Sequence, residues 1–197
     1  MVRTGLVLMF SSMCISLTGV ASPSIAAGAQ QPPVNHLAQS MADFKKRVDG
    51  YLELRRGIAG KLPEVKETGD PAKISGREKA LGTAIAMARA SAKAGDIFGV
   101  EMSHHLKRIL AEDWKARTPA DRKALFAELP PGLQLKVNQP YPTALPLVTV
   151  PTKLLTQLPT LPEELEYRLV DGRLLLRDRD ANLIVDVLAD VLPKRTK

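Results

Sequence analysis

The chain has 197 residues and one cysteine, and its 28 Lys and Arg residues outnumber its 21 Asp and Glu residues, which gives a net charge of +7. A basic surface attracts nucleic acid, anionic lipid and acidic glycans. The aromatic content of 4% is low for a protein that binds single-stranded nucleic acid by stacking bases on aromatic rings, so we predict no nucleic-acid partner.

Residues 1–29 predict a secretory signal peptide. Arg3 precedes an uncharged apolar run, and Ala27-Gly28-Ala29 follows as a cleavage motif. The apolar run has about 16 residues, fewer than the ~20 that span a bilayer, which disfavours the alternative of a retained anchor. Cleavage near Ala29/Gln30 leaves a periplasmic or extracellular chain with no transmembrane segment. It also removes Cys14, and with it any disulfide or thiolate metal site.

The remaining chain is long enough for one domain with a hydrophobic core. We predict an α+β domain over residues 35–192, after a flexible lead-in at 30–34 and before a tail at 193–197. Its three parts are a helical part at 35–129, a Pro-rich connector at 130–162 and a β part at 163–192.

The first helix is predicted by an apolar stripe at helical spacing, with Asn35 as N-cap and Pro63 as the stop. The stripe consists of Leu37, Met41, Phe44, Val48 and Tyr51. We expect it to pack on the domain's own core. The alternative is a coiled-coil seam between two chains, because the spacing is also heptad-like.

Three more helices follow in the sequence. Ser75 and Glu78 form a capping box that predicts a helix from Ser75 to Gly95, with many alanines that permit close approach of neighbouring elements. Asp96 is the expected cap of a helix from about 97 to 116. Thr118 and Pro119 predict a short helix that ends at the prolines of 130–132.

The connector has eight prolines in 33 residues, which excludes long helices. Within it, alternation at 133–137 and the apolar run at 147–150 predict short strands, and 153–158 predicts one helical turn. We expect the connector to wind over the core.

Asp171-Gly172 between two alternating runs predicts a β-hairpin with a two-residue turn. That turn length sets the register, so Leu169 faces Leu174 and Glu166 faces Arg177 as an opposite-charge pair; Tyr167 likewise faces Leu176. A polar turn at 178–181 and a third strand at 182–188 complete a small antiparallel sheet.

Several short segments together resemble a family of small uncharacterised bacterial proteins with signal peptides. The segments are Gly95-Asp96-Ile97-Phe98, Leu135-Lys136-Val137-Asn138, Leu161-Pro162-Glu163-Glu164-Leu165-Glu166-Tyr167-Arg168 and Ala181-Asn182-Leu183-Ile184-Val185-Asp186. The resemblance spans roughly residues 74–192. It implies an exported single domain and supplies no functional site.

Motifs for catalysis and metal binding are incomplete. Glu101 and His104 form one Glu-x-x-His pair, but a di-iron bundle needs a second pair. The run from Asp178 begins like a calcium loop but lacks the later Gly and Glu, so a polar turn is the better interpretation. We predict no catalytic residue, cofactor or metal. The candidate ligand-contact residues are Glu101, His104, His105, Lys107 and Arg108.

The sequence favours a non-enzymatic exported protein that binds an envelope component or a partner protein. One alternative is a hydrolytic enzyme of the envelope that uses Glu101, His104 and His105 or the carboxylates of 163–166. Another is a basic module that docks on anionic lipid or glycan. Its docking residues would be Lys45, Lys46, Arg47, Arg55, Arg56, Lys107 and Arg108. The oligomeric state stays open.

Overall fold

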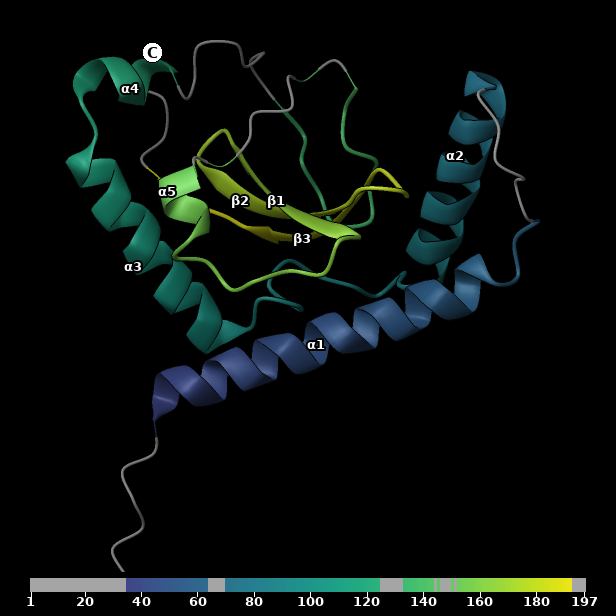
Figure 1. The fold of residues 1–197 in the computed structure, drawn as a ribbon, viewed down its shortest axis with the longest axis horizontal. Helices are drawn as coiled ribbons and strands as arrows, with labels where there is room; N and C mark the ends of the chain where they lie inside the picture. Colours follow the sequence, from purple (N-terminus) through teal and green to yellow (C-terminus); the bar gives the residue numbers. More distant parts are fainter. Residues whose placement is uncertain are drawn as a thin grey trace, which may run out of the picture. The chain divides into compact units, whose positions relative to one another are not determined.

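The computed structural model describes residues 35–63, 70–124, 133–143, 145, 150 and 152–192. They contain five helices and three strands: α1 (His36–Ala59), α2 (Pro71–Ala88), α3 (Val100–Ala116), α4 (Pro119–Ala124), α5 (Thr152–Leu155), β1 (Leu165–Val170), β2 (Arg173–Asp178) and β3 (Leu183–Leu188). The fold is therefore α+β, with N-terminal helices followed by a three-stranded antiparallel sheet in the order β1-β2-β3 (Figure 1). The signal peptide, the lead-in, the tail and most of the predicted strand at 147–150 lie outside the described residues.

The N-cap prediction for α1 is confirmed, because the side chain of Asn35 accepts a hydrogen bond from the backbone N–H of Ala38 at 3.1 Å. Phe44, Val48 and Tyr51 are buried in the domain's own core, as expected for the apolar stripe, whereas Leu37 at the start of the helix is exposed. Figure 1 shows α1 running beneath the sheet and the other helices.

The predicted bounds of α2 are wrong at both ends. The helix begins at Pro71 because Asp70 caps it, accepting from Ala72 N–H at 3.0 Å, so the capping box at Ser75 is not used. It ends at Ala88 instead of Gly95, at the point where the backbone carbonyl of Arg89 accepts a hydrogen bond from the Asn138 side chain. A tertiary contact thus overrides local helix propensity.

The start of α3 also differs from the prediction. The helix begins at Val100 behind Gly99, whose φ of 69° lies in the left-handed region that favours glycine. Asp96 does not cap it, since its carboxylate accepts from Lys93 N–H at 2.7 Å instead. The cap of α4 is as predicted: Thr118 Oγ1 accepts from Asp121 N–H.

The hairpin has the predicted register. Leu169 lies opposite Leu174, Tyr167 opposite Leu176 and Glu166 opposite Arg177. Both turn residues have positive φ, 49° at Asp171 and 70° at Gly172, as a type I′ turn requires. The β2–β3 register shifts between Leu176 and Arg177. The polar turn is shorter than predicted, because Asp178 belongs to β2 and is fully buried.

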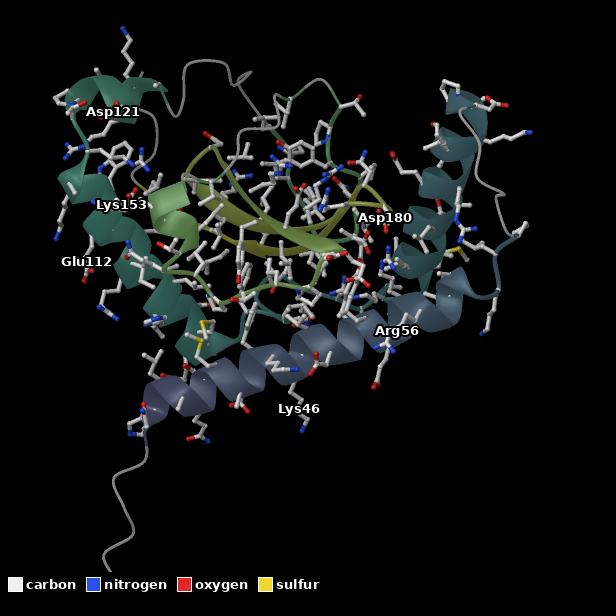
Figure 2. The ribbon with its side chains drawn as sticks, viewed as in Figure 1. Lys46, Arg56, Glu112, Asp121, Lys153 and Asp180 are labelled. Carbon is white, nitrogen blue, oxygen red and sulfur yellow. The ribbon has the colours of Figure 1, made fainter. Side chains whose placement is uncertain are left out.

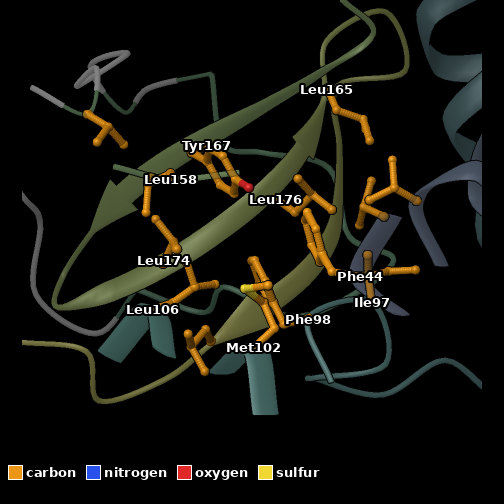
Figure 3. Packing of buried hydrophobic residues seen from close by; sticks show 14 of the residues in the cluster. Phe44, Ile97, Phe98, Met102, Leu106, Leu158, Leu165, Tyr167, Leu174 and Leu176 are labelled. Atoms are coloured by element: carbon orange, nitrogen blue, oxygen red, sulfur yellow. The ribbon is translucent and has the colours of Figure 1, made fainter. Parts of the chain in front are cut away.

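Apolar side chains cover both faces of the sheet. On one face, Leu174, Leu176 and Tyr167 pack with helix residues such as Phe98 and Met102 (Figure 3). The other face carries a smaller cluster, which consists of Leu135, Tyr141, Leu145, Val170, Leu175, Ile184 and Val187. The connector is thus divided: Leu135, Tyr141 and Leu145 pack on the second face, whereas Val150, Leu154 and Leu158 belong to the first cluster.

The predicted strand at 133–137 is wrong. The pairing lies a few residues later, where Asn138 N–H donates to Ile184 C=O and Tyr141 N–H donates to Asn182 C=O. Only Pro140 forms a bridge there, with Leu183, because proline has no N–H with which to extend a ladder. The helical turn predicted at 153–158 is confirmed by α5.

Candidate binding groove

A groove of about 720 Å³ lies beside α2. One wall is α2 together with the turn after it, and the other is formed by residues 137–140 and 181–183. The lining residues are Ser75, Glu78, Lys79, Gly82, Thr83, Ala86, Met87, Ala90, Ala92, Val137, Asn138, Pro140, Ala181, Asn182 and Leu183. Its volume lies within the range of roughly 300–1,000 Å³ that is typical of ligand sites.

A glycine holds α2 close to the second wall. A Cβ atom built on Gly82 would lie 2.6 Å from the carbonyl oxygen of Ala181, closer than real Cβ contacts come. Leu81 and Ile85 anchor the same part of the helix in the core. Residues 71–76 are all exposed, and Figure 1 shows that end of α2 extending away from the sheet.

The α2 side of the groove is formed mainly by small side chains. Thr83, Ala86 and Ala90 leave open space, and Met87 beside them is 74% exposed. Methionine adapts its shape to irregular apolar partners, which makes an exposed one well suited to a binding surface. The alanine-rich run that predicted close packing is thus only partly covered, since Met87, Ala88 and Ala90 are exposed.

The amides in the opposite wall are already hydrogen-bonded. Asn138 accepts from Arg89 and donates to the Arg89 carbonyl, while Asn182 accepts from Arg177 and donates to the Tyr141 carbonyl at 3.1 Å. Side-chain amides that are paired in this way hold the wall in shape. These two amides therefore offer little to a ligand, and the other polar side chains of the lining are Ser75, Glu78, Lys79 and Thr83 on α2.

A buried carboxylate fixes the end of the sheet beside the groove. Asp178 accepts from Tyr51 Oη at 2.7 Å and Arg55 Nε at 2.8 Å, and also from the N–H groups of Asp180 and Ala181. Burial raises the pKa of Tyr51, and Asp178 raises it further. Arg55 also pairs with Asp180, which Figure 2 places at the end of the sheet that faces α2.

This network corrects the predicted basic docking surface. Arg55 is only 8% exposed, because its guanidinium is used to join α1 to Asp178. Burial lowers the pKa of Arg55, but the neighbouring Asp178 outweighs burial, and the pKa is raised overall. Lys46, by contrast, points away from the sheet on the outer side of α1 (Figure 2).

The candidate ligand-contact residues all lie on α3 and do not line the groove. Glu101, His104 and Arg108 are exposed, while His105 and Lys107 are half-buried. Arg108 contacts His105 Nδ1 at 3.1 Å and pairs with Glu112 at 3.3 Å. Burial lowers the pKa of His105, and the positive charge of Arg108 lowers it further.

The carboxylates at 163–166 form no catalytic pair in the described structure. Glu166 bonds both Arg168 and Arg177 on the sheet face that carries the smaller cluster. Burial alone would raise the pKa of Glu166, but the hydrogen bonds from the two arginines outweigh it and lower the pKa. Glu163 is exposed. Glu166 therefore serves as the shared partner of the buried Arg168 and the half-buried Arg177.

Metal binding and membrane spanning can both be assessed for the residue ranges that the structure describes. No group of three or more His, Cys, Asp or Glu residues there is arranged to hold a metal ion. None of the helices in these ranges is long and apolar enough to cross a membrane.

The structure thus defines an α+β domain with a groove beside its second helix. No protein-family model, curated protein or solved structure matches the chain. The resemblance to small exported bacterial proteins stays a prediction from the sequence.

Proposed function

We propose that the chain is an exported, non-enzymatic protein that binds a segment of a partner protein in the groove beside α2. The observation that carries the proposal is the groove itself: about 720 Å³, bounded by small side chains and an exposed Met87, with the amides of its opposite wall already paired. Export rests on the predicted signal peptide at residues 1–29.

A protein segment suits this groove better than a small polar ligand. Small polar ligands are held by convergent polar groups that await a partner, whereas Asn138 and Asn182 are occupied within the domain. An apolar segment gains by removing Met87, Val137 and Pro140 from water, and burial of apolar surface is the dominant favourable contribution in most protein–protein association.

The structure gives the hydrolase alternative less support. Glu101, His104 and His105 do not line the groove, and Glu166 is held by two arginines. The basic-module alternative loses Arg55 to the buried network. Neither alternative has an observation that favours it over protein binding.

The test is comparative capture from the solubilised envelope of the host with three forms of the tagged chain. Ala90→Arg fills the groove from an exposed position outside α2, and Ala111→Arg places the same side chain at an exposed position on α3. We expect one stoichiometric protein with the wild type and Ala111→Arg, and its loss with Ala90→Arg. Met87→Asp serves as a second groove variant and should also lose it.

Equal capture by all forms would show that binding lies elsewhere on the domain. Turnover of a cell-wall or lipid substrate by the purified protein would contradict a non-enzymatic function. Thermal unfolding of each variant controls for folding, since surface substitutions normally change stability by no more than about 0.5 kcal/mol.

A further inference from the structure

We infer that Met87 is an oxidation site that controls the groove beside α2. Hydrogen peroxide converts its thioether to a sulfoxide, partner binding is lost, and reduction of the sulfoxide restores it. The inference rests on the proposed function and adds a regulation of the same groove. It follows from the exposure of the sulfur-bearing side chain, from the place of Met87 in the groove and from the change in polarity.

Met87 is the most exposed of the three methionines that the structure describes. It is 74% exposed, whereas Met102 is 1% exposed in the core and Met41 is half-buried against the core. Thr83 and Ala84 precede Met87 by one turn on the same side of α2, and their side chains are too short to cover it. Peroxide in the solvent therefore reaches Met87 before the other two methionines.

The sulfur chemistry of the exported chain rests on methionine alone. Cys14 is the only cysteine in the sequence, and removal of the predicted signal peptide takes it away, so no thiol of the chain competes for the oxidant. In the oxidation, the sulfur lone pair bonds one peroxide oxygen, the O–O bond breaks and water leaves. In the reduction, two thiols of a methionine sulfoxide reductase form a disulfide, and the sulfoxide oxygen leaves as water.

The sulfoxide changes what the groove offers a partner. Met87 lines the groove with Ala86 and Ala90, and its thioether adapts to an apolar partner. A sulfoxide is polar, and burying it against a partner that offers no donor loses its hydrogen bonds to water. We expect binding to weaken by about tenfold. The fold should stay intact, because Met87 belongs to neither hydrophobic cluster.

The first measurement is the selectivity of oxidation. The full mature chain is treated with increasing hydrogen peroxide, and the gain of oxygen at each methionine is followed by mass spectrometry of its peptides. We expect Met87 to react first, Met41 later and Met102 only when the protein unfolds. Thermal unfolding of the treated chain controls for damage to the fold. Reaction of Met41 or Met102 at the rate of Met87 would overturn the inference.

The second measurement is the ratio of partner captured after and before peroxide treatment, taken separately for each form of the tagged chain. We expect this ratio to fall about tenfold for the wild type and for Met41→Leu, and to stay constant for Met87→Leu, since leucine has no sulfur to oxidise. A methionine sulfoxide reductase should restore capture by the oxidised wild type. A constant ratio for the wild type, or an equal fall with Met87→Leu, would contradict control by Met87.

The Ala90→Arg variant separates this inference from the proposed function. If Ala90→Arg loses the captured protein while the wild type with fully oxidised Met87 retains it, the groove binds a partner but Met87 does not control it. If Ala90→Arg also retains the captured protein, the proposed function is itself wrong.

Discussion

Replacing Gly82 by alanine tests the close approach that forms the groove, and Gly76 on the same helix provides a matched control. Both glycines lie inside α2. A Cβ on Gly76 has nothing within 4 Å, whereas a Cβ on Gly82 would lie 2.6 Å from the Ala181 carbonyl oxygen and 3.7 Å from its carbon. The two substitutions thus share one helix-propensity gain and differ in one steric contact.

The magnitudes follow from these two contributions. Alanine is favoured over glycine in a helix interior by about 1 kcal/mol, so Gly76→Ala should stabilise the protein by about that amount. Gly82→Ala has the same gain, but its Cβ forces a backbone carbonyl to move, and overpacking of this kind costs about 1–3 kcal/mol. We expect the Gly76→Ala protein to be more stable than the Gly82→Ala protein by about 2 kcal/mol.

The assay is urea denaturation of the wild type and both variants, with the transition followed by circular dichroism. The slope with denaturant should stay constant, because neither change alters the surface exposed on unfolding, and the midpoints then report stability directly. Equal free energies of unfolding for the two variants would refute the close packing of α2 against Ala181, and with it the position of the groove wall.

Three further predictions concern the polar contacts. Asp178→Asn should destabilise the protein by about 3 kcal/mol in urea denaturation, because it breaks the buried charge pair with Arg55. Tyr51→Phe should destabilise it by about 1 kcal/mol, because it removes the hydrogen bond to Asp178. Additive effects of the two substitutions in a double-mutant cycle would contradict direct contact between Tyr51 and Asp178. The pKa of Glu166 is lower in the folded state, so the ionised side chain contributes stability that is present above its unfolded pKa and is lost as pH falls through its folded pKa. Glu166→Gln should therefore be less stable than the wild type by about 2 kcal/mol at neutral pH, and this difference should vanish in acid. A stability difference that stays constant with pH would contradict this. Asn35→Ala should cost about 1 kcal/mol by loss of its cap, with fraying of the first turn of α1 seen in hydrogen exchange.

The sequence predicted those parts of the fold that depend on neighbouring residues. The hairpin register followed from the Asp171-Gly172 turn, because a two-residue loop leaves one way to pair the flanking strands. The buried stripe of α1 followed from helical spacing. The bounds of α2 were missed because two capping signals competed at its start and the distant Asn138 side chain bonds the Arg89 carbonyl at its end.

The groove itself was beyond prediction from the sequence. It requires α2, residues 137–140 and residues 181–183 to lie together, and no local pattern encodes that proximity. The alanine-rich run was a signal of close packing, but not of which side of the helix is covered. Arg55 was assigned to a docking surface for the same reason, since its partner Asp178 lies 123 positions away.

Asp186 makes the junction between α2 and α3 depend on the last strand of the domain. This buried carboxylate of β3 accepts from the N–H groups of Gly95, Ile97 and Phe98, which lie 88 to 91 positions earlier in the link between α2 and α3. Synthesis from the N-terminus makes the link between α2 and α3 before it makes this carboxylate, and contacts over such separations form slowly. The junction between α2 and α3 can therefore be completed only after β3 has been made. A truncation that removes β3 also releases this junction.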